Sequence, residues 1–138
     1  MLLDRHSFKT KEELNHACVT SASFGNYTNV IRLLKIGADP NHLHARDGWG
    51  ALHYASRWND IKMLQALVYF GADIDLRTKG RETALHVAAS FNRKEAAIYL
   101  LSKGADISCK NHEESKTAEQ LCVDPELRTI IANWENKK

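Results

Sequence analysis

The amino-acid sequence predicts an all-α protein: a solenoid of stacked helix-turn-helix units from which β-hairpin loops protrude. Two short words recur along the chain. Gly-Ala-Asp begins at Gly37, Gly71 and Gly104, and Ala-Leu-His-x-Ala begins at Ala51 and Ala84. Both words repeat at a period of about 33 residues, which is typical of helical repeat proteins. Because they keep the same phase, we interpret the chain as a series of equivalent structural units.

A third feature keeps the same period. Gly25, Asn59 and Asn92 each lie twelve residues before a Gly-Ala-Asp word. Glycine and asparagine tolerate a positive φ better than other residues. Each is therefore expected to form a tight turn between the two helices of a unit.

The second unit shows why such helices must stack. Residues 50–58 and 60–70 carry apolar side chains at helical spacing, and Gly71 follows as a helix-ending glycine. Helices of two or three turns do not persist alone in water. Small alanines in the first helix of the unit allow a neighbouring helix to approach closely. One unit cannot bury its own apolar face, so its stability must come from the next unit.

We expect one domain over 1–138, with units at about 8–41, 42–75, 76–108 and 109–135 and with degenerate terminal units. The expected helices are at about 11–23, 27–36, 50–58, 60–70, 83–91, 93–103, 117–122 and 124–134. Thr10 with Glu13 is typical of a capping box, and Asp124 before Pro125 is typical of a helix start.

The repeated words resemble the ankyrin repeat, whose signature includes Thr-Pro-Leu-His-x-Ala. The resemblance covers roughly residues 11–135, although Gly50-Ala51 and Thr83-Ala84 replace the usual Thr-Pro. It implies that His53 and His86 tie each helix start to the neighbouring hairpin by hydrogen bonds, which is a structural role. The glycines of Gly-Ala-Asp are structural in the same sense.

Composition excludes several classes of function. The chain is 43% hydrophobic and 26% charged, as in globular proteins, and its net charge is +2. This charge gives no strong field for nucleic acid or an anionic membrane. The best apolar run, residues 96–101, is far shorter than the roughly 18 residues of a membrane span. Three cysteines without paired spacing favour reduced thiols. We therefore expect a cytoplasmic protein, with the nucleus as the alternative, and neither membrane insertion nor direct nucleic-acid binding.

Catalysis has no sequence support. No nucleophile elbow, phosphate loop or dinucleotide-binding glycine run occurs, so we expect a non-enzyme without a cofactor. His42 and His44 form a His-x-His pair near Asp47, but no third ligand has suitable spacing nearby. No metal site is predicted.

Aromatic residues at repeat phase are the strongest functional signal. Phe24, Trp58 and Phe91 each precede a predicted turn residue, and the period places them side by side. One interpretation is packing within the stack. The other is partner binding, because in ankyrin proteins this edge and the hairpin tips form the usual binding surface. Trp49 adds to the second, since its position is commonly solvent-facing in the family. The candidate partner-binding residues are Trp49, Trp58, Phe91, Phe24, Arg46, Asp47, Arg57, Lys79, Arg81, Glu82 and Ser90.

The leading hypothesis is a module that binds another protein through a concave surface and acts as an adaptor, inhibitor or scaffold. The alternative is the targeting domain of a larger enzyme or lipid-transfer protein that binds a membrane-attached small GTPase. Asn41 also looks like the asparagine that ankyrin proteins present to an oxygen-dependent asparaginyl hydroxylase. Hydroxylation of Asn41 is therefore a further hypothesis, although Pro40 replaces the usual valine.

Overall fold

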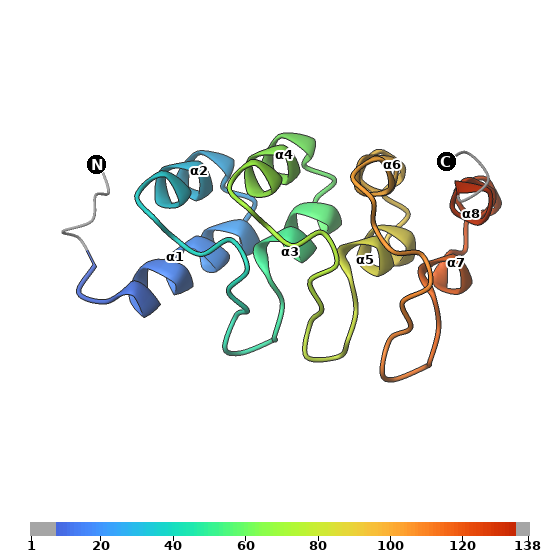
Figure 1. Cartoon of the computed structure of the whole chain (residues 1–138), viewed down its shortest axis with the longest axis horizontal. Helices are drawn as coiled ribbons and strands as arrows, with labels where there is room; N and C mark the ends of the chain where they lie inside the picture. Colours follow the sequence, from blue (N-terminus) through green and yellow to red (C-terminus); the bar gives the residue numbers. More distant parts are fainter. Residues whose placement is uncertain (1–7, 135–138) are drawn as a thin grey trace.

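The computed structural model describes residues 8–134, so the predicted domain bounds of 1 and 138 lie outside the described residues. This part of the chain folds into eight helices arranged in four successive pairs (Figure 1). They are α1 (Lys11–Ser23), α2 (Tyr27–Lys35), α3 (Ala51–Arg57), α4 (Ile61–Tyr69), α5 (Ala84–Ser90), α6 (Lys94–Ser102), α7 (Ala118–Leu121) and α8 (Pro125–Ala132). The all-α expectation is confirmed, and the helix ends lie close to the expected bounds.

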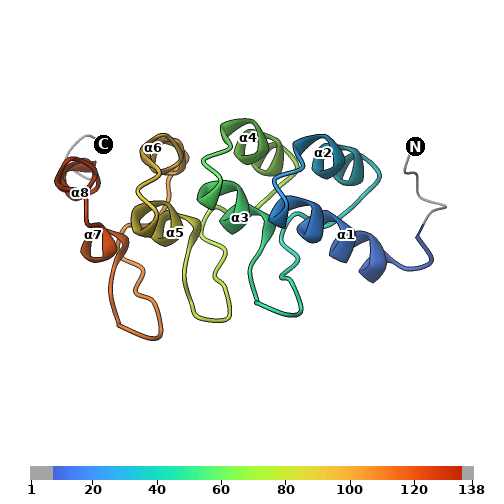
Figure 2. The same cartoon turned by 180° about the vertical axis from the view of Figure 1, so that it is seen from behind.

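The helices form two layers (Figures 1 and 2). Helices α1, α3, α5 and α7 form an inner layer in which each helix contacts the next, and α2, α4, α6 and α8 lie above them. The three long loops before α3, α5 and α7, which we call the first, second and third loops, all project beyond the inner layer on the same side. No helix within residues 8–134 is long and apolar enough to cross a membrane.

The turn residues adopt the backbone conformation that the repeat predicts. Gly25, Asn59 and Asn92 have φ values of 72°, 54° and 54° between the two helices of a pair. Each Gly-Ala-Asp glycine follows the second helix of a pair, again with φ positive. Because an L side chain is strained there, the sequence concentrates glycine and asparagine at these points.

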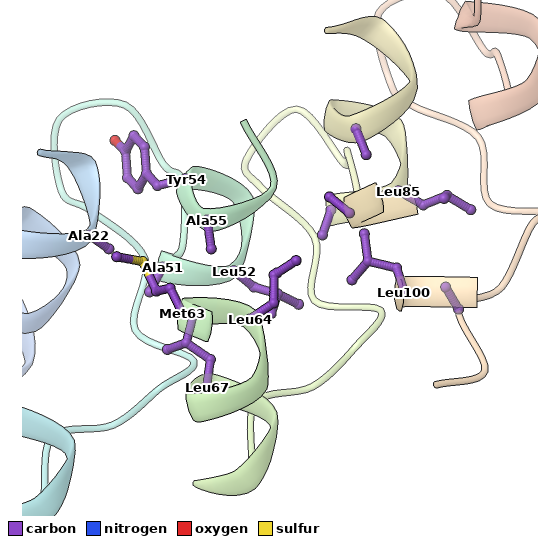
Figure 3. Packing of buried hydrophobic residues seen from close by; sticks show 14 of the residues in the cluster. Ala22, Ala51, Leu52, Tyr54, Ala55, Met63, Leu64, Leu67, Leu85 and Leu100 are labelled. Atoms are coloured by element: carbon purple, nitrogen blue, oxygen red, sulfur yellow. The ribbon is translucent and has the colours of Figure 1, made fainter. Parts of the chain in front are cut away.

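The core lies between the layers and between successive pairs (Figure 3). Ala22, Ala55 and Ala88 are fully buried in the inner helices, where their small side chains allow close approach. Leu52 of α3 and Leu64 of α4 are also fully buried, in the same apolar cluster. The pairs therefore share one continuous core.

The protruding loops are hairpins with little strand character, in contrast to the expected β-hairpins. In the described chain only one isolated antiparallel bridge occurs, between Leu43 and Gly50. The second loop is closed by the Thr78 N–H, which donates to the Glu82 carbonyl at 2.9 Å. A hydrogen bond across the turn thus joins the two arms of this loop, which does not form a β-ladder.

Adjacent units also exchange polar contacts. Helix α6 begins after Arg93, whose side chain makes no capping bond. The cap comes from the preceding unit: Asn59 Oδ1 accepts the Ala96 N–H at 2.9 Å, and Asn59 Nδ2 donates to Glu95 at 3.0 Å. A side chain of unit two thereby fulfils the N-cap role for a helix of unit three.

The cap supplied by Asn59 gives a matched stability test. Asn59→Gly keeps a residue that accepts a positive φ but removes the hydrogen bonds to Glu95 and Ala96, and should lower the free energy of unfolding by about 1 kcal/mol. Asn92→Gly is the control, because Asn92 has the same φ of 54° and its side chain makes no such bond to any residue between 8 and 134. Urea denaturation of both variants measures the difference. Equal losses in the two variants would show that the cap contributes nothing.

Candidate protein-binding surface

The second loop is held in place by a buried histidine. His53 is fully buried at the start of α3. The Gly50 N–H donates to its Nδ1 at 2.9 Å, which leaves the ring proton on Nε2. Nε2 lies 3.0 Å from both the Leu76 and the Glu82 carbonyls, in the loop that follows the unit. One imidazole thus joins the start of an inner helix to both arms of the next hairpin.

His86 repeats this arrangement one unit later. The Thr83 N–H donates to Nδ1 at 3.1 Å, and Nε2 lies 3.0 Å from the Lys116 carbonyl in the following loop. These are the contacts that the family resemblance assigns to the histidine of the repeat word. They position the loop tips relative to the inner helices.

Both histidines favour the neutral form. Burial lowers the pKa of His53 to about 4, against carbonyl contacts that raise it. Burial likewise lowers the pKa of His86 below its ordinary value. A proton on Nδ1 would also face the donating N–H of Gly50, which explains why the charged form is unfavourable.

The aromatic residues at repeat phase lie exposed at the ends of the inner helices. The exposed fractions of Phe24, Trp58 and Phe91 are 80%, 48% and 42%. Trp58 packs over Gly25, where an added Cβ would lie 3.7 Å from the indole nitrogen. The Arg57 guanidinium lies 5.7 Å from the ring centroid of Trp58 and 5.2 Å from that of Phe91. We call Phe24, Trp58 and Phe91 the aromatic row.

Arg57 is itself anchored, since its carbonyl accepts a hydrogen bond from Arg93 Nε at 2.7 Å. Its charged group lies over two rings, and stacking of this kind is favourable. Ser90, the residue before Phe91, is exposed beside the row. The structure therefore brings together the part of the predicted site that lies on the inner helices.

A hollow of about 610 Å³ lies beside the aromatic row, between α1 and the first loop. His16, Thr20 and Phe24 line it from the helix, and residues 44–47 line it from the loop. His16 and Thr20 were not among the residues predicted from the sequence. Their helical spacing before Phe24 is the signal that could have found them, because side chains at every fourth position share a helix face.

Trp49 differs from expectation: it is partly buried and packed against the core. Its ring centroid lies 5.2 Å from that of Tyr54 and 6.0 Å from that of His53. The expectation of a solvent-facing residue is wrong, because the hairpin folds the indole back onto α3. Trp49 thus contacts the candidate site through Tyr54, which lines the hollow.

Asp47 also makes intramolecular contacts. Its carboxylate accepts hydrogen bonds from the Tyr54 hydroxyl and, at 3.0 Å, from the Trp49 N–H. Partial burial raises its pKa, but these hydrogen bonds outweigh burial and hold the pKa below its ordinary value. Asp47 therefore fixes the shape of the first loop. Arg46 beside it is exposed.

The second loop contributes a basic tip. The Lys79 N–H donates to the Gly48 carbonyl at 3.3 Å, and the Lys79 ammonium lies 3.4 Å from the Ala45 carbonyl. Lys79 therefore contacts the first loop through both its backbone and its side chain. Arg81 is exposed with φ of 63°. Glu82 is partly buried and uses its backbone to close the loop.

Asn41 links two units. Its Oδ1 accepts the Asp73 N–H at 2.7 Å, and its Nδ2 lies 3.3 Å from the Gly71 carbonyl. Hydroxylation of Asn41 stays a prediction. His42 lies 3.6 Å from Glu12, and the part of the chain between residues 8 and 134 contains no group of three or more side chains that could hold a metal ion.

Equivalent helix pairs, two of them tied by a histidine to the next hairpin, define a helical repeat protein. The chain belongs to the ankyrin repeat family, because the family model for ankyrin repeats (three copies) matches residues 16–111. Ankyrin repeats are protein-interaction modules.

Known relatives agree with this assignment. The chain is 30% identical over 141 residues to human SH3 and multiple ankyrin repeat domains protein 2, a match that covers 94% of this chain and 7% of that protein. It is 32% identical over 101 residues to mouse protein phosphatase 1 regulatory subunit 27, covering 73% and 62% of the two chains. It is also 28% identical over 98 residues to the Drosophila melanogaster ARF GTPase-activating protein Git, covering 71% and 13%. The chain thus spans less than two thirds of the length of each relative.

The buried histidines predict a loss of stability in mild acid. The unfolded chain binds a proton at the ordinary histidine pKa of 6.5, whereas folded His53 does so only near 4. The free energy of unfolding should therefore fall as pH drops below 6.5, by about 2 kcal/mol at pH 5 from His53 alone. Urea titrations between pH 7 and pH 5 measure this. His53→Gln should flatten the dependence, and a flat curve for the wild type would refute the assignment.

Proposed function

We propose that the chain acts as an adaptor, inhibitor or scaffold that binds a protein partner through the aromatic row and the tips of the first two loops. The observation that carries the proposal is the in-register exposure of Phe24, Trp58 and Phe91 at the ends of successive inner helices. Intra-stack packing holds part of Trp58 against Gly25 but does not account for Phe24, which is 80% exposed. Large apolar groups exposed together mark interaction surfaces more often than chance scatter does.

The chemistry of the row suits a binding hot spot. Tryptophan and arginine are enriched among the residues that dominate interface energy, and Trp58 lies beside Arg57 here. Stacking on two rings limits the freedom of the Arg57 side chain before any partner arrives. Less conformational entropy is then lost on binding.

Rigid loops support the same role. The first and second loops are joined by the bond from Lys79 to Gly48, and the second and third by the His112 N–H, which donates to the Gly80 carbonyl at 2.9 Å. His53 and His86 also fix the second and third loops, because their Nε2 atoms contact backbone carbonyls of these loops. A partner would therefore meet a preformed surface, and little ordering would accompany binding.

Affinity capture with a matched control tests the proposal. The tagged chain is compared with the triple variant Phe24→Ser/Trp58→Ala/Phe91→Ala and with Tyr69→Ala. Tyr69 is 83% exposed on α4, in the other helix layer, so its removal deletes an exposed aromatic outside the row. Proteins captured by the wild type should be retained by Tyr69→Ala and reduced at least about tenfold with the triple variant, as the loss of a hot-spot residue implies.

Circular dichroism establishes that each variant is folded. If the folded triple variant captures the same proteins in the same amounts, the aromatic row is not the binding surface. Loss with Tyr69→Ala alone would place the surface on the outer layer instead. Capture of a small GTPase through the row would favour the targeting role over that of an inhibitor.

A further inference from the structure

We infer, building on the proposed function, that the partner presents an acidic segment in which a carboxylate lies next to an aromatic or large aliphatic side chain. The carboxylate would enter the hollow between α1 and the first loop, and the apolar side chain would lie against Phe24 and Trp58. This inference names the chemistry of the partner, which the proposed function leaves open.

The hollow and the aromatic row are continuous. Phe24 lines the hollow of about 610 Å³ and also a second one of about 570 Å³ that it shares with Trp58. Volumes of this size lie within the range of about 300–1,000 Å³ found for ligand sites. One segment of a partner can therefore occupy both, with Phe24 as the wall between them.

The first hollow is lined by groups that donate hydrogen bonds. The His44 Nδ1 accepts the Arg46 N–H at 3.1 Å, so a neutral His44 carries its proton on Nε2. No acceptor within residues 8–134 forms a hydrogen bond with this Nε2–H group. The His16 ring lies 5.2 Å from the His44 ring and is exposed. The Arg46 guanidinium makes no ion pair with the described residues. These groups can receive an anion without losing an existing partner.

The acidic groups near the hollow are already engaged. The Asp47 carboxylate is held by Tyr54 and by the Trp49 N–H, and it lies 3.8 Å from His44 Nδ1. Glu12, one helical turn before His16, lies 3.6 Å from His42. Asp47 keeps its negative charge at one side of the hollow, so an incoming carboxylate would be received on the side lined by Arg46, His16 and His44.

The surrounding surface has the same sign. Arg57 lies along the aromatic row, and Lys79 and Arg81 extend from the tip of the second loop. Glu82 lies beside this tip, and Asp73 and Asp75 lie nearer the start of the loop. Complementary charge speeds encounter and selects the partner, while apolar contact supplies most of the affinity. Nucleic acid fits less well, because phosphate recognition along a strand needs a continuous basic stripe, and the chain carries a net charge of only +2.

A peptide library tests the inference with the full chain. Random twelve-residue peptides displayed on phage are selected on the immobilised protein, and enriched sequences are resynthesised with a fluorescein label. Enriched peptides should combine Asp or Glu with a neighbouring aromatic or large aliphatic residue. In fluorescence anisotropy, Arg46→Ala should weaken their binding about tenfold, as expected for a charge-assisted hydrogen bond. Phe24→Ser should also weaken it.

Lys35→Ala is the charge-matched control, because Lys35 lies on α2 and lines a different hollow with Tyr69 and Phe70. It should leave the affinity unchanged. Raising the salt concentration should weaken binding to the wild type and have less effect on Arg46→Ala.

The outcomes separate the two claims. The inference is overturned if the peptides require Phe24, Trp58 and Phe91 for binding but carry no acidic residue. It is also overturned if they bind Arg46→Ala as tightly as wild type. Either result leaves the proposed function standing. No enriched peptide, or tighter binding to a labelled dT20 oligonucleotide than to any peptide, also overturns the inference. The capture experiment then decides the proposed function separately.

Discussion

Burial between neighbouring helix pairs is the interaction on which the rest of the structure depends. An inner helix such as α3 has only seven residues and cannot persist alone in water. Leu52 and Ala55 of this helix are nonetheless fully solvent-inaccessible, because α1 and α5 lie against it on either side. Each pair provides part of the interior of the next, and stability accumulates along the stack.

The arrangement of the surface follows from this packing. Since each unit repeats the same contact with its neighbour, a residue at one repeat position lies next to its equivalents. Phe24, Trp58 and Phe91 are aligned for that reason, and Arg57 can contact two rings that belong to successive units. The histidines extend this order to the loops, because the buried imidazoles of His53 and His86 fix the hairpins that follow them. The candidate binding surface is therefore a product of the same repeat that builds the core.

Much of the fold can be predicted from the sequence, because its determinants are local and periodic. Gly71, for example, follows the end of α4 with φ of 97°, as its position after an apolar helical segment predicts. What could not be predicted depends on the path of the loops. Trp49 was expected to face solvent, but the hairpin turns it onto Tyr54. Asn59 was expected only to make a turn, and its capping of α6 depends on how two units meet.

The candidate site divides in the same way. The aromatic row could be predicted from its period, whereas the hollow beside it required the first loop to be placed next to α1. His16 lies on α1 and His44 in the first loop, and they share no motif, so no sequence pattern pairs them. This part of the site forms only when the stacked helices and the hairpin are both in place.

Native-state hydrogen exchange of Leu52→Ala tests the central claim most directly. The substitution opens a cavity in α3 and should cost about 3 kcal/mol. If the pairs share one core, protection of backbone amides should fall in α1 and α5 as well as in α3 and α4. Loss of protection confined to α3 and α4 would mean that each pair is stable by itself, and would contradict the account.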